Sequence, residues 1–151
     1  MLQHSLCMNP PEPPSITIRR TIEWVDTDAS GHYHFTSAMR LFEAAEAALL
    51  EELGFVQEVY GRIPRAHVSV DYRRTLFFRD VVHVTVRVES VGTSSVTYGF
   101  DVSRAEELCA SGRVVAVLVD ASGGPSPWPP EWAGALSGDR RPLDSAPPPP
   151  E

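Results

Sequence analysis

The sequence predicts an α+β fold in which a curved antiparallel sheet of about five strands wraps around one long central helix. Residues 35–53 carry apolar side chains at helical spacing, and Gly54 follows them as a left-handed cap. Four later stretches have the pattern of strands, and no helix separates them, so they must pair antiparallel. A single apolar helix has to be covered, and the sheet is the element that can cover it.

The apolar stripe of the helix identifies the face that packs on the sheet. It comprises Phe35, Ala38, Phe42, Ala45, Leu49 and Leu53. The two alanines permit a close approach of the sheet. Glu46 borders this stripe, and a carboxylate in that position needs a partner. We expect it to reach solvent or to pair with Arg40.

The strands are predicted, in chain order, over 15–25, 66–76, 81–91, 96–102 and 113–120. Residues 81–91 alternate most clearly, because valines at every second position take one face and polar residues take the other. Residues 113–120 are almost continuously apolar, which predicts a central strand buried on both faces. A polar loop over 26–34 joins the first strand to the helix.

Proline marks the ends of the predicted domain, because it is excluded from packed sheets and helix interiors. Of the 14 prolines, only Pro64 lies between residues 15 and 124. We expect a disordered Pro-rich head over 1–14, a folded domain over 15–135 and a Pro-rich tail over 136–151. Two tryptophans, Trp128 and Trp132, lie near the end of the domain, and we expect them to dock on it.

Composition and charge narrow the classes of partner. The chain has 151 residues, 42% of them hydrophobic, and a net charge of -7, which fits one acidic domain and disfavours nucleic acid as a partner. No apolar run reaches the ~18 residues of a membrane span, and no secretion signal is visible. Cys7 and Cys109 form no disulfide framework, so the expected compartment is the cytoplasm.

The densest group of reactive side chains lies in the loop over 26–34. Asp26 and Asp28 are close together, Gly31 permits a tight turn, and the chain then enters a helix. The free N–H groups of a helix start favour developing negative charge, so a carboxylate beside them makes a workable acyl-transfer site. Simple capping of the helix or turn is the other interpretation of these residues.

Two segments carry a resemblance to a known family. Trp24-Val-Asp-Thr-Asp-Ala-Ser-Gly-His32, followed by Met39-Arg-Leu-Phe-Glu-Ala-Ala45, resembles the 4-hydroxybenzoyl-CoA thioesterase family of hot-dog proteins. The later strands and the segment 129–132 agree with the family in order, so that the resemblance covers roughly 16–132. It implies a hot-dog fold, a thioester hydrolase activity and no cofactor.

The resemblance also implies roles for residues of the loop. Asp28 corresponds to the family's catalytic carboxylate, which attacks the thioester carbonyl or activates water. Phe35 occupies the position whose backbone N–H polarises that carbonyl, and Gly31 matches the turn glycine. Asp26 corresponds to a residue that shapes the loop.

Two histidines, His32 and His34, distinguish this loop from the family pattern. We expect them to line the mouth of the site and tune the water, or to be residues of the active-site loop with a hydrogen-bonding role. Together with Asp28 they lack the fourth ligand that a structural metal site needs, so no metal is expected.

The chain departs from the family at the positions that contact the substrate. Ser37-Ala38 replaces the usual residues near the helix start, which reshapes the acyl pocket. Gly92-Thr-Ser94 stands where some relatives place basic residues that bind coenzyme A, which leaves both acyl-CoA and an acyl-carrier protein as substrates. Arg73, Arg74 and Arg79 are the candidates to bind the substrate instead, or they are solvated charges at the strand ends.

A hot-dog sheet leaves an edge that a second copy can cover. We therefore expect a homodimer or a homotetramer built as a dimer of dimers, with the substrate cleft between subunits. Two other functions remain open on this fold. Asp28-Ala-Ser-Gly-His32 resembles, without its Asn-Pro, the motif of hot-dog hydratases and dehydratases. The departures at Ser37 and Gly92 are also compatible with a non-catalytic acyl-binding protein.

Overall fold

The computed structural model describes residues 12–139, so most of the predicted head and tail lies outside the described residues. The elements follow in the order β1 (Ser15–Thr21), η1 (Trp24–Asp26), α1 (Ser37–Leu53), α2 (Val56–Val59), β2 (Arg65–Tyr72), β3 (Val81–Val91), β4 (Ser95–Arg104), β5 (Glu107–Val117) and α3 (Pro130–Leu136). The short helices α2 and α3 and the turn η1 add to the elements that the sequence predicted.

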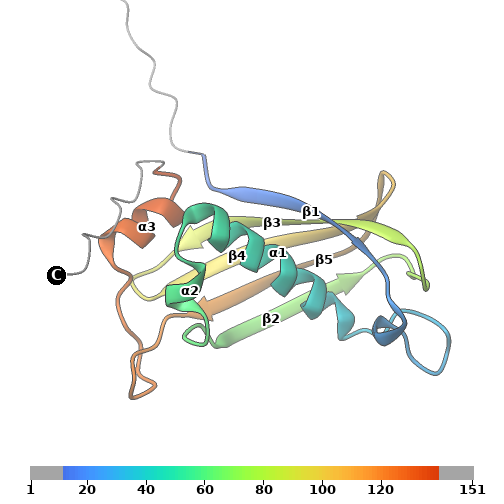
Figure 1. Ribbon diagram of the computed structural model, residues 1–151, viewed down its shortest axis with the longest axis horizontal. Coiled ribbons are helices and arrows are strands. Elements are labelled where there is room, and N and C mark those ends of the chain that lie inside the picture. Colours follow the sequence, from blue (N-terminus) through green and yellow to red (C-terminus); the bar gives the residue numbers. More distant parts are fainter. Residues whose placement is uncertain (1–11, 140–151) are drawn as a thin grey trace, which may run out of the picture.

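The five strands form one antiparallel sheet in the order β1-β3-β4-β5-β2. Helix α1 lies across one face of this sheet, and the loop that leads into it lies at one end of the molecule (Figure 1). The expected α+β architecture is therefore confirmed. Strands β1 and β2 are its two edges, and each presents unpaired backbone groups on its outer side.

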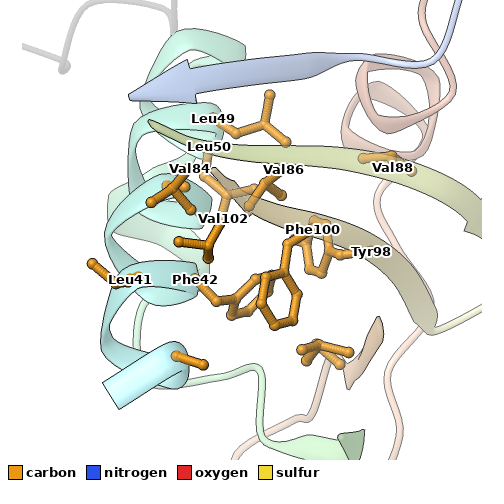
Figure 2. Close-up of a cluster of buried hydrophobic side chains, with 14 of the residues drawn as sticks. Leu41, Phe42, Leu49, Leu50, Val84, Val86, Val88, Tyr98, Phe100 and Val102 are labelled. Carbon is orange, nitrogen blue, oxygen red and sulfur yellow. The ribbon is translucent and has the colours of Figure 1, made fainter. Parts of the chain in front are cut away.

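The core forms between α1 and the central strands. Phe42 packs against Tyr98 and Phe100 of β4, with ring centroids 5.5 and 5.4 Å apart and the ring planes inclined, and Figure 2 shows these three side chains grouped together. The alternate valines Val84 and Val86 of β3 are fully buried, as their spacing predicted. Burial of these side chains holds the helix on the sheet, and truncation of a buried phenylalanine to alanine typically costs about 3–5 kcal/mol.

The entry to the helix differs from the prediction. Helix α1 begins at Ser37, with Thr36 as its N-cap, so Phe35 lies before the helix and is 67% exposed. The predicted apolar stripe holds for its middle members, but Phe35 does not belong to it, because the chain still turns at 35–36. At the other end, Gly54 has φ of 95° and its N–H donates to the carbonyls of Leu50 and Glu51, which confirms the predicted cap.

The strand boundaries also differ, most of all in β1, β2 and β5. Strand β1 ends at Thr21 because the chain turns into η1 at Trp24. Strand β2 ends at Tyr72, short of the predicted 76. Strand β5 begins at Glu107 and not at residue 113, because Glu107 pairs with Arg104 in a tight hairpin. The prediction that this strand is buried on both faces is wrong, because burial alternates along it: Val114 and Ala116 are buried, Val115 and Val117 are only partly buried, and Arg113 is exposed.

Glu46 is buried and does not pair with Arg40. Its two carboxylate oxygens accept hydrogen bonds of 2.7 and 2.6 Å from the Arg65 guanidinium, which also lies 5.2 Å from the centre of the Phe42 ring. This bidentate pair joins the first residue of β2 to the middle of α1. A buried charge pair of this geometry fixes the register of the edge strand relative to the helix.

Both C-terminal tryptophans dock on the domain, as expected. Trp128 is buried and donates its indole N–H to the Ser95 carbonyl at 2.9 Å. Trp132 stacks on Phe55 with ring centroids 5.2 Å apart. Across residues 12–139, none of the helices has the length and apolar character needed to cross a bilayer.

Candidate active site

Asp26 organises the loop between β1 and α1. Its carboxylate is buried and accepts the Glu23 N–H at 2.8 Å and an Arg40 guanidinium N–H at 2.5 Å. Its carbonyl accepts the His34 N–H at 2.7 Å and the Ser37 hydroxyl at 2.9 Å. These contacts use both ends of the residue to hold the loop against the start of α1, so Asp26 has a structural position and does not face the site described below.

Asp28 lies on the exposed side of the same loop. One carboxylate oxygen, Oδ1, accepts the Ser30 N–H at 2.8 Å and also the Ser30 hydroxyl, and Gly31 closes the turn with φ of 81°. The other oxygen makes no hydrogen bond with any residue between 12 and 139. The two bonds from Ser30 lower the pKa of the Asp28 carboxyl below its ordinary value, so the group is a carboxylate at neutral pH.

The main-chain N–H groups of residues 33–37 differ in whether they donate a hydrogen bond. Four of them donate: Tyr33 to Leu76 O at 2.9 Å, His34 to Asp26 O at 2.7 Å, Thr36 to His34 Nδ1 at 3.1 Å and Ser37 to His34 O at 2.9 Å. The Phe35 N–H has no acceptor among the residues that the structure describes. It is therefore the one donor of this run that remains available for a ligand at the helix entry.

Asp28 and Phe35 share one open hollow of about 390 Å³. It is lined by Asp28, Ser30, His32, Tyr33, Phe35, Tyr72, Arg73, Arg74 and Thr75. Of the three candidate substrate-binding arginines, Arg73 and Arg74 therefore lie at the hollow and Arg79 does not. Arg79 takes φ of 74° in the turn before β3, where its N–H donates to the Ile22 carbonyl.

The two histidines of the loop have different surroundings. His34 stacks on the Phe35 ring at 4.7 Å between centroids, and its Nδ1 lies 2.6 Å from the Thr36 hydroxyl. It therefore braces the chain on both sides of the Phe35 N–H. His32 lies at the hollow, and its ring makes a T-shaped contact with the Phe77 ring, with the two centroids 5.4 Å apart. Within residues 12–139, no three His, Cys, Asp or Glu side chains gather as metal ligands.

Two residues at the site carried no signal in the sequence pattern. The Tyr72 hydroxyl donates to the Phe35 carbonyl, across 37 positions of the chain. The Tyr33 hydroxyl is buried without a hydrogen-bond partner among the described residues, and burial raises its pKa, so it stays protonated. Both tyrosines were visible only as members of alternating or loop segments, because their contacts depend on how β2 lies against the helix entry.

Two larger hollows lie away from Asp28. One, of about 500 Å³, borders β1 and contains the Asp26–Arg40 ion pair. The other, of about 540 Å³, lies at the Arg65 end of β2. Most of its lining residues are apolar, among them Ala47, Leu50, Val56, Val59, Ile63 and Val119, and the charged residues Glu43, Glu46 and Arg65 also line it.

The fold is that of the hot-dog thioesterases, as comparison with known proteins shows. The chain superposes on a predicted thioesterase from Bacillus stearothermophilus with a TM-score of 0.74 and 25% identity, over 82% of this chain and 94% of that one. It has the same fold as the DHNA-CoA thioesterase from Staphylococcus aureus, with a TM-score of 0.75 and 20% identity, over 82% of this chain and 89% of that one.

The chain belongs to the thioesterase-like superfamily, whose family model matches residues 22–136. It is similar to the 1,4-dihydroxy-2-naphthoyl-CoA hydrolase of Nostoc punctiforme, with 27% identity over 113 residues, which is 72% of this chain and 76% of the relative. The resemblance seen in the sequence is thereby confirmed, and the enzyme class is thioester hydrolase.

Proposed function

We propose that this protein hydrolyses acyl-CoA thioesters, with the Asp28 carboxylate and the Phe35 N–H acting on the two ends of the reacting carbonyl. The observation that carries the proposal is the Phe35 N–H, the one N–H in the run 33–37 without an acceptor among residues 12–139, at a hollow that also holds an ionised carboxylate. A donor of this kind is useful where negative charge develops on an oxygen, as it does in acyl transfer.

The chemistry follows from these two groups. The thioester oxygen accepts the Phe35 N–H, which stabilises the oxyanion of the tetrahedral intermediate. Asp28 either attacks the carbonyl carbon itself or takes a proton from the water that attacks it, and both routes need its ionised form. On the general-base route the C–S bond of the water adduct then breaks, the thiolate takes up a proton, and the products are a carboxylic acid and a free thiol. On the nucleophilic route, breaking the C–S bond leaves an anhydride between the acyl group and Asp28, and a water molecule then hydrolyses this anhydride to release the acid and restore the Asp28 carboxylate.

The choice of coenzyme A as leaving group rests on charge and on relatives. Arg73 and Arg74 line the hollow, and guanidinium groups bind phosphate oxygens well. Arg74 already pairs with Glu107 at 2.7 Å, while Arg73 makes no ion pair within residues 12–139 and is the stronger candidate. The Nostoc relative is named for a CoA thioester. The proposed setting is the cytoplasm, as expected for a sequence whose two cysteines form no disulfide framework.

We also propose that a second copy of the chain completes the hollow of Asp28. Strand β2 is an edge strand, and two of its large hydrophobic side chains, Val68 and Tyr72, are 43% and 46% exposed. An exposed apolar edge strand of this kind can pair with the same strand of a second copy. Antiparallel pairing of two β2 strands about a two-fold axis keeps both helices on the same face of a continuous sheet. It brings the Tyr72 end of one strand to the Arg65 end of the other.

This pairing places two unlike hollows side by side. The hollow with Asp28 has the reactive groups and few apolar walls, whereas the 540 Å³ hollow at the Arg65 end is mainly apolar. In a dimer the reacting carbonyl would lie in the hollow of Asp28. The rest of the acyl group would lie in the 540 Å³ hollow of the other copy. The homodimer, or a tetramer of two such dimers, is therefore part of the proposed function.

The activity is tested by thiol release from a panel of acyl-CoAs of varied chain length and aromaticity, with the same acyl groups on a carrier protein. We expect stoichiometric free thiol and carboxylic acid from at least one acyl-CoA, and slower release from the carrier-protein thioesters. Addition of water to an enoyl-CoA without thiol release would instead support a hydratase. Tight binding of acyl-CoA with no product would support a binding protein, and either result overturns the proposal.

The dimer is tested on β2 itself. Val68→Arg places a charge on the exposed edge strand and should yield a monomer with little activity in sedimentation velocity and thiol-release assays. Ser15→Arg makes the same change on the opposite edge strand, β1, and should leave both mass and activity unchanged. An active monomer of the Val68 variant would contradict the shared cleft.

A further inference from the structure

Tyr72 connects the sheet to the residue that carries the available N–H. It is the last residue of β2, and its hydroxyl donates to the carbonyl of Phe35, just before α1. Its side chain lines the hollow of Asp28 and is half exposed, so the hydroxyl is not needed to satisfy a buried core. The hydrogen bond from this hydroxyl instead restrains the main chain at Phe35.

The effect concerns the direction of the Phe35 N–H. His34 is tied to Asp26 through its own N–H, and Thr36 is tied to the His34 ring through its N–H. These bonds lie within the loop and the helix entry, so they leave the Phe35 carbonyl free. The Tyr72 bond occupies that carbonyl, so that the backbone on both sides of the Phe35 N–H is held.

We infer that Tyr72 is a positioning residue, which acts through the Phe35 carbonyl to aim the Phe35 N–H into the hollow. The inference rests on the proposed function, because an aimed donor matters only if an oxyanion forms there. An oxyanion donor must lie within hydrogen-bond distance of the transition-state oxygen, so a small rotation of this residue weakens the bond when charge is greatest.

The test is the variant Tyr72→Phe, which keeps the ring and removes the hydroxyl. We expect kcat for the best acyl-CoA of the panel to fall about 10- to 100-fold, because a misplaced catalytic donor costs up to that amount. KM should stay within about twofold, because the lost interaction is made chiefly in the transition state. A rise in KM with unchanged kcat would mean that Tyr72 binds substrate directly, and it would overturn the inference.

A matched control separates this effect from loss of a hydrogen bond in general. Thr17→Val removes a hydroxyl that bonds to Thr85 at 2.7 Å between β1 and β3, away from the hollow. It should lower thermal stability by as much as Tyr72→Phe or more, with kcat unchanged. If both variants lower kcat equally, the effect is one of stability and the positioning role is wrong.

A second measurement reports on the donor itself. Infrared spectra of a carbonyl-labelled acyl-CoA bound to an Asp28→Asn protein should show the thioester stretch displaced to low frequency, and adding Tyr72→Phe should reduce that displacement. An unchanged displacement overturns the inference while leaving the proposed function intact. The proposed function itself fails separately, if the wild-type protein releases no thiol from any thioester.

Discussion

The tetrapeptide Asp-Ala-Ser-Gly occurs twice in this chain, at 28–31 and at 120–123, and both copies fold in the same way. In each, Oδ1 of the aspartate accepts the N–H and the hydroxyl of the serine, and the glycine N–H donates to the aspartate carbonyl at 3.0 Å. The two glycines have φ of 81° and 85°. In both copies the serine bonds lower the pKa of the aspartate carboxyl.

The two turns differ in what surrounds them. Asp120 follows β5, and its Oδ1 accepts one further N–H, from Gly124, at 3.1 Å. Within residues 12–139 the second oxygen of each aspartate accepts no hydrogen bond, but Asp28 alone of the two lies at the hollow shared with the Phe35 N–H. The comparison teaches that the turn accounts for the ionised state of the carboxylate, whereas its position beside a free main-chain donor accounts for the proposed chemistry. The second turn is thus a control within the same molecule.

The largest expected effect separates the two aspartates. Asp28→Asn keeps an oxygen to accept the Ser30 bonds but removes the base or nucleophile, so kcat should fall by about 10²- to 10⁴-fold with nearly unchanged Tm. Asp120→Asn makes the same change in the other turn and should leave kcat unchanged. Thiol release and thermal unfolding of both variants check this. Equal activity of the two variants would remove the distinction between the turns.

The next effect concerns the glycines. A Cβ at Gly31 or Gly123 meets no atom within 4 Å, so alanine at either position is penalised by the left-handed backbone alone. Each substitution should lower the free energy of unfolding by a similar amount, about 1–2 kcal/mol. Only Gly31→Ala should also lower kcat, since it displaces Asp28. Urea unfolding and thiol release test the pair, and a wild-type kcat in Gly31→Ala would argue against a geometric requirement at this turn.

The smallest effect concerns the serines. Ser30→Ala removes a hydrogen bond from the Asp28 carboxylate, so the pKa of that carboxyl should rise toward its ordinary value. Because the group must be ionised to act, the acid limb of kcat/KM should move to higher pH, with little change at pH 7. Any stability from the lowered pKa is present above the ordinary value and is lost as the pH falls through the folded value.

The matched variant for this effect is Ser122→Ala, which should raise the pKa of the Asp120 carboxyl and leave the activity profile unchanged. A carboxyl-detected NMR titration assigns the two shifts to their residues. If Ser122→Ala moves the acid limb as far as Ser30→Ala does, the limb reports acid unfolding and not Asp28.

The architecture was predictable from sequence because its signals are local and periodic. The alternation over 81–91 matches β3 at both ends, and Gly54 ends the helix as expected. The start of α1 was missed by two residues, because the bonds that hold Phe35 outside the helix come from His34 and Tyr72. The spacing of apolar residues does not indicate such hydrogen bonds.

In the candidate site, too, contacts between adjacent residues were predictable and contacts between distant residues were not. Asp28 and Gly31 form a turn from adjacent residues, so the sequence could indicate it. The Tyr72 contact and the Glu46–Arg65 pair join residues 37 and 19 positions apart, and they depend on where β2 lies against α1. Their partners become apparent only when the sheet register is known. The second Asp-Ala-Ser-Gly turn, at 120–123, lies away from the hollow of Asp28, so this motif alone does not identify a site.

The most direct measurement is the infrared spectrum of a thioester with a labelled carbonyl, bound at saturation to the Asp28→Asn and Asp120→Asn proteins. The account predicts that the Asp28 variant retains the thioester with its carbonyl stretch displaced to low frequency, while the Asp120 variant converts it to free acid. A bound carbonyl that absorbs where it does in water, or turnover by both variants, would contradict the account.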